Sequence, residues 1–257
     1  MRFVRFQSAA GRRWGVVEGD RVREVEGNVL ERWRATERTT AIAGLELLPP
    51  CEPSKIVALG LNYKSHALEV NMPIPEDPSM FLKATTALIG PGEPIVYPKR
   101  SNRVDYEAEL ACVIRKPARR VSRQDALSYV WGYTCLNDVT ARDIQFTGGN
   151  FLNLTWSKGY DTFCPVGPWV VADEINPDDV LVQCYVNGEQ RQSASTSDFI
   201  FPMADQIVWL SNVMTLLPGD VVTTGTPAGI GPMQVGDVVE VRIAGIGSLR
   251  NPIAGEE

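Results

Sequence analysis

Two glutamates inside an otherwise apolar stretch constrain this chain more than any other feature. Residues 105–110 read Asp-Tyr-Glu-Ala-Glu-Leu and run on into Ala-Cys-Val-Ile, which predicts a buried strand. Because side chains two residues apart in a strand point to the same face, Glu107 and Glu109 project side by side. Neighbouring carboxylates repel each other, and a hard divalent cation with oxygen ligands would turn that repulsion into coordination. Asp138, which follows the apolar segment 131–136, is a candidate for a third oxygen ligand.

The single histidine provides a second candidate cluster. His66 and Glu69 lie three residues apart in the segment 60–69, and on a helical turn they share a face. A carboxylate bonded to one imidazole nitrogen fixes the tautomer and makes the other nitrogen a better base, able to activate water. Each cluster also has an ordinary structural explanation: a solvent-exposed strand face for the glutamates, and a surface ion pair for His66 and Glu69.

The composition argues against several other functional classes. A net charge of −6 over 257 residues argues against a nucleic-acid-binding or anionic-membrane surface. No segment approaches the roughly 20 consecutive apolar residues that a membrane helix needs. The five cysteines are scattered without a Cys-x-x-Cys pair, which favours a reducing cytoplasm and, with one histidine, argues against a zinc site. The compatible cofactor is Mg²⁺ or Mn²⁺ bound by oxygen ligands.

A proline-rich segment at residues 48–53, Leu-Pro-Pro-Cys-Glu-Pro, divides the chain. We predict a small N-terminal β-meander domain over residues 1–50, with a short helix within residues 29–43, and a larger domain over residues 51–257. Three prolines make residues 71–78 an irregular exposed loop, which is either a lid over the His66 cluster or a plain connector.

Further polar candidates flank the carboxylates. Residues 140–143, Thr-Ala-Arg-Asp, resemble a capping box that opens a helix, and on that helix Arg142 and Gln145 would face the acidic cleft. Alternatively, Arg142 only pairs with a nearby carboxylate. The glycine-rich residues 223–231 lack the Lys-Ser/Thr of a phosphate loop, but they can offer backbone N–H groups and the Thr226 hydroxyl to a carboxylate.

Taken together, these segments resemble the fumarylacetoacetate hydrolase family. The resemblance covers about residues 53–253, and the short N-terminal portion is similar to that of the compact bacterial members. No single motif is decisive, but the ordered set is specific. In family order, the matching segments are Gly-Leu-Asn-Tyr-Lys-Ser-His-Ala-Leu-Glu (60–69), Phe-Leu-Lys (81–83), Asp-Tyr-Glu-Ala-Glu-Leu (105–110), Asn-Asp-Val-Thr-Ala-Arg-Asp-Ile-Gln (137–145), Lys-Gly-Tyr-Asp-Thr-Phe (158–163), Pro-Val-Gly-Pro-Trp (165–169), Pro-Gly-Asp-Val-Val-Thr-Thr-Gly-Thr-Pro-Ala-Gly (218–229) and Gly-Ile-Gly-Ser-Leu-Arg-Asn (245–251).

The resemblance implies a β-dominated α+β fold: a mixed β-sandwich roll behind a small N-terminal β-rich domain, assembled as a homodimer. Lys158 is similar to the family's active-site lysine, and His66 with Glu69 is similar to the dyad of the members that hydrolyse or decarboxylate. The ligands implied for Mg²⁺ or Mn²⁺ are Glu107, Glu109 and Asp138. The residues expected to hold the carboxylates of the substrate are Lys83, Arg142, Gln145 and Thr226.

The resemblance further implies a small 2-oxo or 2,4-dioxo acid as substrate, with the ion stabilising an enolate as a Lewis acid. Isomerisation, decarboxylation and C–C bond hydrolysis use the same groups, so the sequence does not separate them. We expect a dicarboxylic acid such as 2-hydroxyhepta-2,4-diene-1,7-dioate or its carboxylated precursor. Acylpyruvate hydrolysis and oxaloacetate decarboxylation stay open, as does a non-catalytic oxo-acid-binding protein on the same fold.

Overall fold

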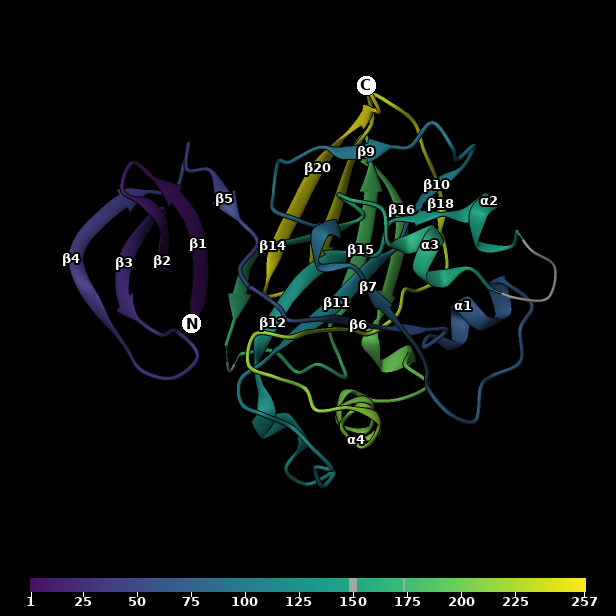
Figure 1. The fold of residues 1–257 in the computed structure, drawn as a ribbon, viewed down its shortest axis with the longest axis horizontal. Helices are drawn as coiled ribbons and strands as arrows, with labels where there is room; N and C mark the ends of the chain where they lie inside the picture. The colour runs from purple at the N-terminus through teal and green to yellow at the C-terminus, as the bar shows by residue number, and fades with distance from the viewer. Residues whose placement is uncertain (148–151, 173) are drawn as a thin grey trace.

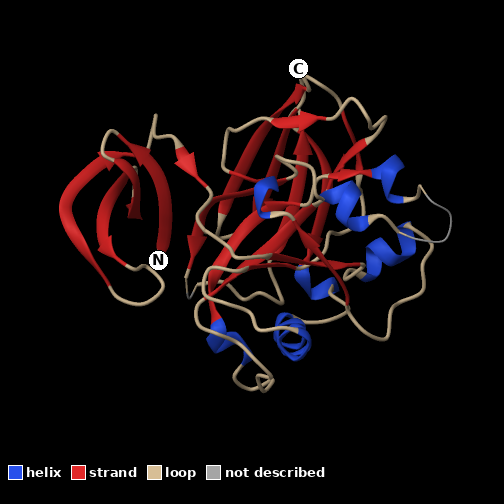
Figure 2. Cartoon of the chain, in the orientation of Figure 1, coloured by secondary structure: helices blue, strands red, loops and turns tan. Residues whose placement is uncertain are grey.

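Strands form most of the regular structure in the computed structural model, which describes residues 1–147, 152–172 and 174–257. The helices are short and lie at the periphery of the strands (Figure 1 and Figure 2). This β-dominated α+β architecture confirms the predicted fold class. The strands are β1 (Arg2–Ser8), β2 (Gly11–Glu18), β3 (Arg21–Gly27), β4 (Trp33–Ala41), β5 (Leu47–Leu48), β6 (Ile56–Gly60), β7 (Ser79–Lys83), β8 (Leu88–Ile89), β9 (Ile95–Tyr97), β10 (Val104–Tyr106), β11 (Ala108–Ile114), β12 (Val130–Asn137), β13 (Thr140–Ala141), β14 (Cys164–Val171), β15 (Leu181–Val186), β16 (Glu189–Ser195), β17 (Val221–Thr223), β18 (Gly231–Met233), β19 (Val238–Ile243) and β20 (Gly247–Gly255).

The helices complete the element order and are few. Within the described residues, none is long and apolar enough to cross a membrane. They are α1 (Lys64–Glu69), α2 (Arg142–Gln145), α3 (Leu154–Lys158) and α4 (Met203–Val213), with short 3₁₀ turns η1 (Thr85–Ala87), η2 (Ala126–Tyr129) and η3 (Thr196–Asp198).

Strand β11 lies in the middle of the largest sheet, whose order is β4-β3-β2-β1-β14-β12-β11-β17-β6-β7. It pairs antiparallel with β12 on one side and with β17 on the other. All seven of its residues are buried, as expected for a strand covered on both faces. This central position puts the end of β11 that carries the acidic motif deep inside the molecule.

The two faces of β11 have different partners because side chains alternate along a strand. One face packs against the second sheet, whose order is β16-β15-β19-β20-β9, to form the main core of the sandwich. Its core residues on β11 are Ala108, Leu110, Cys112 and Ile114. The other face contributes Ala111 and Val113 to a separate apolar cluster with the N-terminal strands, and Glu109 lies on this same face. The period-two pattern of the sequence therefore separates the apolar core from the acidic face.

The N-terminal strands β1 to β4 form a meander that extends the large sheet, because β1 pairs with β14 at Arg2–Val171 and Phe3–Val170. The helix predicted within residues 29–43 is wrong, since residues 33–41 form β4. Cross-strand ion pairs stabilise β4 against β3, among them Arg38 with Glu24 and Arg34 with Glu26. A pairing partner with complementary charges overrides a weak local preference for helix. The predicted boundary at residue 50 stays a prediction.

Candidate active site

The acidic motif is interrupted at Glu107, which lies between β10 and β11 and belongs to neither strand. Its backbone N–H donates to Asn137 Oδ1 at 2.9 Å, and its carbonyl accepts from the Asp138 N–H at 2.9 Å. This exchange joins the acidic motif to the end of β12, so the side chains of Glu107, Glu109 and Asp138 converge. One carboxylate oxygen from each lies within 4.8 Å of the others, and all three residues are buried. The solvent-exposed alternative for the Glu-x-Glu pair is therefore wrong.

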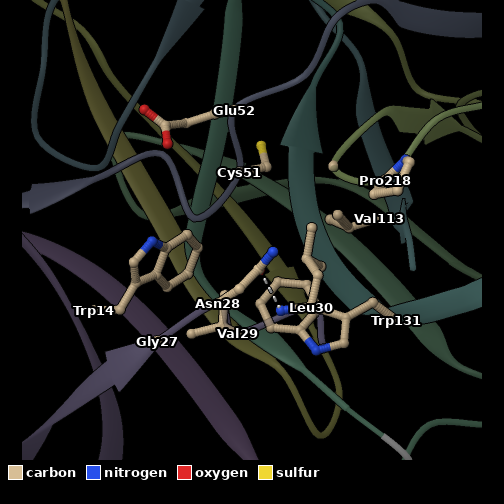
Figure 3. Close-up of a pocket in the computed structure, with 11 residues that line it drawn as sticks. Trp14, Gly27, Asn28, Val29, Leu30, Cys51, Glu52, Val113, Trp131 and Pro218 are labelled. Carbon is tan, nitrogen blue, oxygen red and sulfur yellow. Dashed lines mark hydrogen bonds between the residues drawn. The ribbon is translucent and has the colours of Figure 1, made fainter. Parts of the chain in front are cut away.

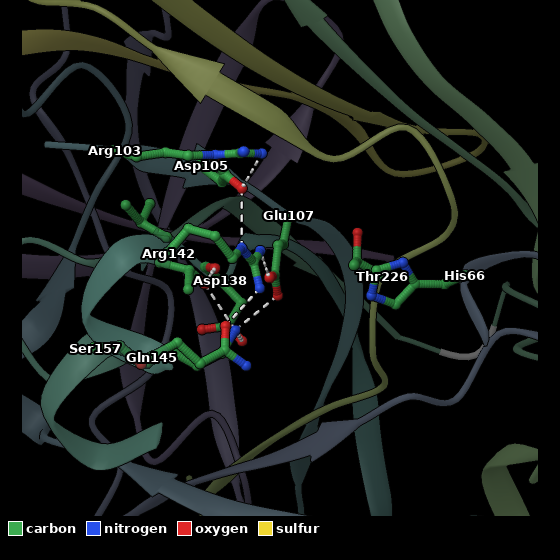
Figure 4. Close-up of polar contacts among 12 residues, drawn as sticks. His66, Arg103, Asp105, Glu107, Asp138, Arg142, Gln145, Ser157 and Thr226 are labelled. Carbon is green, nitrogen blue, oxygen red and sulfur yellow. Dashed lines mark hydrogen bonds and ion pairs between the residues drawn. The ribbon is translucent and has the colours of Figure 1, made fainter. Parts of the chain in front are cut away.

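Charges of alternating sign form a continuous chain through this cluster (Figure 4). It begins at the half-exposed Arg103 and ends at the buried Lys83. The order is Arg103, Asp105, Arg142, Glu107, Lys158, Asp138 and Lys83. Each buried charge in this series thus has an oppositely charged partner, which offsets the cost of desolvating an ion. Glu109 is not part of the series.

Arg142 and Lys158 each contact two carboxylates in the middle of this series of ion pairs. Arg142 Nε donates to Asp105 Oδ2 at 2.9 Å, and its Nη2 donates to Glu107. Lys158 Nζ lies 2.7 Å from Glu107 Oε2 and 2.6 Å from Asp138 Oδ2, and it also donates to Thr140 Oγ1 at 2.7 Å. The pairing that the sequence offered as an alternative for Arg142 is therefore real.

The surroundings shift the pKa values of the two glutamates in opposite directions. Burial would raise the pKa of Glu107, but the positive charges of Lys158 and Arg142 outweigh it and lower that pKa below its usual range. Burial, and then the negative charges of Asp138 and Glu107, raise the pKa of Glu109 well above its usual value. Lys158 keeps its proton because Asp138 and Glu107 raise its pKa against the effect of burial.

This donor set fits a hard divalent cation. Glu109 Oε2 accepts from the Gly225 N–H at 2.9 Å and from the Thr223 hydroxyl, which orients the carboxylate and leaves Oε1 for another partner. All the candidate ligands are carboxylate oxygens, the type that Mg²⁺ and Mn²⁺ prefer. A cation among them would favour the ionised form of Glu109, whose pKa is raised first by burial and then by the negative charges of Asp138 and Glu107. Glu107, Glu109 and Asp138 would hold it.

The histidine pair forms as predicted. His66 lies on α1, and its Nδ1 is 2.8 Å from Glu69 Oε2, so a neutral ring donates from Nδ1 and presents Nε2 as the base. The other oxygen of Glu69 accepts from the Gly229 N–H at 2.8 Å. His66 is buried, with 8% of its surface exposed, so an ordinary surface pair does not describe it.

A small polar cavity of about 70 Å³ brings the two clusters together. Of the residues predicted for the site, eight line this cavity. They are His66, Glu107, Glu109, Asp138, Arg142, Gln145, Lys158 and Thr226. Glu69 lies behind His66, and Figure 4 shows the imidazole beside Thr226, with Glu107 between them and Arg142. Leu59, Leu61, Phe81 and Leu154 supply apolar walls.

Two predicted substrate ligands have different contacts in the structure. Lys83 is outside the cavity lining among the described residues, and its ammonium pairs with Asp138 Oδ1 at 2.5 Å. The Thr226 hydroxyl donates to Ala108 O at 3.0 Å and accepts from Gln192 Nε2 at 2.8 Å. The side chains of Lys83 and Thr226 therefore pair with other groups of the protein. Their binding of substrate stays a prediction.

The predicted capping box is wrong. Helix α2 begins at Arg142 after Ala141, and no side chain caps it. Thr140 instead pairs in β13, and its hydroxyl donates to Asp138 O at 2.8 Å. Arg142 and Gln145 nevertheless lie together as expected, with Arg142 Nη1 donating to Gln145 Oε1 at 2.6 Å.

Sequence reasoning missed three residues that shape the site. Asp105, fully buried, pairs with Arg103 and Arg142. Its place in the acidic motif was a usable signal, because a third carboxylate within five residues needs partners of its own. The side-chain oxygens of Asn137 and Gln192 accept hydrogen bonds from the backbone N–H groups of Glu107 and Ala108, respectively. Asn137 adjoins Asp138 in the sequence, whereas nothing in the sequence around Gln192 marks it.

A second cavity of about 350 Å³ lies between the N-terminal strands and β11 (Figure 3). Its walls include the indoles of Trp14 and Trp131 and the thiol of Cys51. Burial raises the pKa of that thiol, which keeps it protonated and unreactive. Glu52 is the one carboxylate among its described lining residues, and no lysine or histidine is among them. The described lining of this cavity therefore offers no lysine or histidine to act with Glu52 in acid–base chemistry.

The fold and the site define a class of protein: a β-sandwich scaffold with a buried carboxylate cluster beside a His–Glu pair. The chain belongs to the fumarylacetoacetate hydrolase family, since the family profile described as fumarylacetoacetate (FAA) hydrolase, C-terminal, matches residues 55–254. A second profile, described as Rv2993c-like, N-terminal, matches residues 1–50. The suspected resemblance is confirmed.

Relatives with printed names include two hydrolases and an isomerase. A 2,4-didehydro-3-deoxy-L-rhamnonate hydrolase from Sphingomonas sp. is 39% identical over 278 residues, covering 99% of this chain and 96% of that protein. The structure of a 2-hydroxyhepta-2,4-diene-1,7-dioate isomerase from Mycobacterium marinum is 41% identical with a TM-score of 0.91, covering 100% of this chain and 99% of that chain. A maleylpyruvate hydrolase from Sphingobium, solved with manganese(II) and pyruvate, is 31% identical with a TM-score of 0.82 and full coverage of both chains.

Proposed function

We propose that this protein is an enzyme dependent on Mg²⁺ or Mn²⁺ that isomerises, decarboxylates or hydrolyses a small 2-oxo or 2,4-dioxo carboxylic acid. The observation that carries this proposal is the convergence of Glu107, Glu109 and Asp138, with oxygens within 4.8 Å of one another in a buried site. The manganese and pyruvate in the similar maleylpyruvate hydrolase support the same class of ion and ligand. The similar isomerase from Mycobacterium marinum supports a dicarboxylate of the 2-hydroxyhepta-2,4-diene-1,7-dioate type as substrate.

When bound, the cation would supply Lewis-acid stabilisation of the negative charge that develops on the 2-oxo oxygen. Arg142 and Gln145 on α2 offer guanidinium and amide N–H groups to a substrate carboxylate from the cavity wall. The ammonium of Lys158 adds positive charge at the same wall, and Asp138 and Glu107 keep it protonated. A fixed cationic wall of this kind stabilises an enolate more than the neutral ketone.

His66 would move the proton. Its Nδ1–H donates to Glu69, so the lone pair on Nε2 accepts the proton. In hydrolysis that proton comes from the water that attacks the distal carbonyl, and in isomerisation it moves from one carbon to another. In decarboxylation no water attacks, and the histidine would only deliver a proton to the product carbon.

Hydrolysis of an acylpyruvate is the second candidate reaction. The His66–Glu69 contact at 2.8 Å favours it over decarboxylation, because this pair can activate the water that hydrolysis requires. Decarboxylation of oxaloacetate needs the positively charged cavity wall formed by Arg142 and Lys158, but it does not need this base. Comparing the two substrates therefore separates the candidates.

A combined binding and turnover screen tests the proposal. Thermal unfolding is measured in EDTA, with MnCl₂, and with MnCl₂ plus oxalate, because a ligand specific for the native state raises Tm. Turnover is followed spectrophotometrically with acetylpyruvate, oxaloacetate and 2-hydroxyhepta-2,4-diene-1,7-dioate, with Glu109→Gln as the matched variant. We expect Mn²⁺-dependent stabilisation and turnover that the variant loses. Absence of both in the wild-type protein rejects the proposal, and tight oxalate binding without turnover favours a non-catalytic binding protein.

A further inference from the structure

Gly229 joins the His66 pair to the acidic motif through hydrogen bonds on both of its backbone polar groups. Its N–H donates to Glu69 Oε1 at 2.8 Å, and its carbonyl accepts from the Tyr106 hydroxyl at 2.9 Å. Tyr106 is the residue directly before Glu107. A continuous path of hydrogen bonds therefore runs from the acidic motif through Tyr106, Gly229 and Glu69 to His66.

Two glycines make this path sterically possible. Gly229 has φ +100°, and a Cβ there would lie 2.4 Å from Arg191 O, so another residue would be strained and would clash. At Gly231 a Cβ would lie 2.8 Å from the Tyr106 hydroxyl oxygen itself. The loop at residues 224–230, between β17 and β18, is thus shaped to receive the Tyr106 hydroxyl, and the contact is not an incidental one.

Other contacts fix the same loop to the acidic motif from the far side. Gln192, 1% exposed, accepts from the Ala108 N–H at 3.0 Å and donates to Pro227 O at 2.8 Å. The Thr226 hydroxyl donates to Ala108 O at 3.0 Å. The loop therefore sits at a fixed distance from Glu107 and Glu109 on one side and from Glu69 on the other.

We propose that Tyr106 is a positioning residue, which fixes Gly229 so that its N–H holds Glu69, and through Glu69 the ring of His66, at a set orientation toward the carboxylate cluster. Glu69 needs such support because its side chain is 30% exposed and would otherwise sample other rotamers. The effect on catalysis rests on the function proposed above, whereas the effect on the histidine does not.

The lone histidine makes the orientation directly measurable. Because the chain has one histidine, the imidazole C–H signals in ¹H NMR belong to His66 alone. Tyr106→Phe removes only the hydroxyl and leaves the buried ring, which is 3% exposed. We expect the His66 signals to shift and broaden, and kcat for acetylpyruvate with Mg²⁺ to fall about fivefold to tenfold at nearly unchanged KM, the size of one lost hydrogen bond.

Two comparisons separate positioning from general damage. Tyr133→Phe removes a hydroxyl from another buried tyrosine of the same core and should leave the signals and kcat unchanged. Gly231→Ala displaces the Tyr106 hydroxyl without altering the tyrosine, and should reproduce the Tyr106→Phe signature. Gly255→Ala is its control, since a Cβ there meets Val235 only at 3.9 Å. Thermal unfolding confirms that each variant is folded.

The outcomes are distinct. If Tyr106→Phe keeps the His66 signals and a kcat within about twofold of wild type, less than one lost hydrogen bond costs, the positioning role is overturned. If the wild-type protein turns over none of the oxo-acids, the proposed function fails, and the NMR comparison alone decides whether Tyr106 positions His66.

Discussion

Lys158 Nζ lies 2.7 Å from Glu107 Oε2, inside the cluster of carboxylates that we propose as a cation site. The same ammonium contacts Asp138 Oδ2 at 2.6 Å, so one lysine pairs with two of the three candidate ligands, and Arg142 and Lys83 supply further positive charge to them. Glu109, which has no ion pair among the described residues, is the carboxylate whose pKa is raised. The protein thus balances part of the acidic charge itself and leaves one carboxylate in excess, which a bound cation would satisfy.

Replacing Lys158 by methionine should destabilise the metal-free protein. The change leaves Glu107 and Asp138 close together in a buried site, and removing one partner of a buried pair typically costs about 3–5 kcal/mol of unfolding free energy. MnCl₂ should recover more of Tm in Lys158→Met than in the wild type, because the ion supplies the missing positive charge. Urea and thermal unfolding, with and without MnCl₂, measure both effects.

The exposed Lys116→Met is the matched control, and we expect it to change the unfolding free energy by no more than about 1 kcal/mol, because it loses only the exposed contact of its ammonium with the Tyr129 ring. A Lys158→Met protein as stable as the wild type in EDTA would contradict the assigned charge balance. A variant that MnCl₂ fails to stabilise would contradict the cation site.

Glu109 should make the metal-free protein less stable as pH rises. Its pKa is raised in the folded state above the ordinary value of about 4.3, so the folded state binds more protons than the unfolded state above that pH. The unfolding free energy attributable to Glu109 therefore falls as pH rises through this window. Glu109→Gln, neutral at every pH, should be more stable than the wild type at pH 8 in EDTA and should lose the advantage toward pH 4.

Mn²⁺ should reverse that order, because the wild-type carboxylate is the better ligand. Urea unfolding from pH 4 to pH 8, in EDTA and in MnCl₂, gives both comparisons, and the exposed Glu31→Gln serves as control. A pH slope in Glu109→Gln equal to that of the wild type would assign the effect to another group.

The sequence predicted the strands around the site because their patterns reflect burial directly. Period-two alternation and turn signals were enough to predict the strands that form β11 and β12. The helix predicted within residues 29–43 failed for the opposite reason. Strand β4 has no fully buried residue, and its structure comes from pairing with β3, a partner that a local pattern cannot reveal.

The acidic site was predictable in its members but not in its connections. Carboxylates in an apolar strand must have partners, so Glu107, Glu109 and Asp138 could be grouped from the sequence. The supporting amides could not: Gln192 lies on β16, more than 80 residues from the Ala108 N–H that it accepts. Nor could the sequence reveal that Lys83 would pair with Asp138 outside the cavity, because that depends on where β7 meets the end of β12.

Replacing Arg142 by lysine should weaken substrate binding more than it slows turnover. The planar guanidinium contacts Asp105, Glu107 and Gln145 at once, and a single ammonium cannot reproduce that fork. We expect KM for acetylpyruvate to rise about tenfold, the cost of one charge-assisted hydrogen bond, with kcat less affected. Steady-state kinetics with Mg²⁺ measure both constants.

Arg103→Lys is the control, since Arg103 pairs with the same Asp105 from the half-exposed outer end of the chain of charges. It should change KM by less than about twofold, because lysine keeps the charge beside Asp105 and Arg103 is outside the cavity lining among the described residues. Equal effects of the two substitutions would mean that Arg142 acts only through Asp105 and does not bind substrate.

Replacing His66 by asparagine should separate hydrolysis from decarboxylation. Asparagine cannot accept a proton from water, so acetylpyruvate hydrolysis should fall by about 100- to 10,000-fold, the usual contribution of a general base. Glu69→Gln keeps the imidazole and loses only its charged partner, so we expect a smaller loss of about tenfold. Decarboxylation of oxaloacetate, in which no water attacks, should be reduced much less by either change.

Neither residue belongs to the carboxylate cluster, so the Mn²⁺ affinity measured by titration calorimetry should stay unchanged. Equal losses on both substrates would show that His66 does not act as the base for water, and a loss of Mn²⁺ affinity would show that the two clusters are not chemically separate.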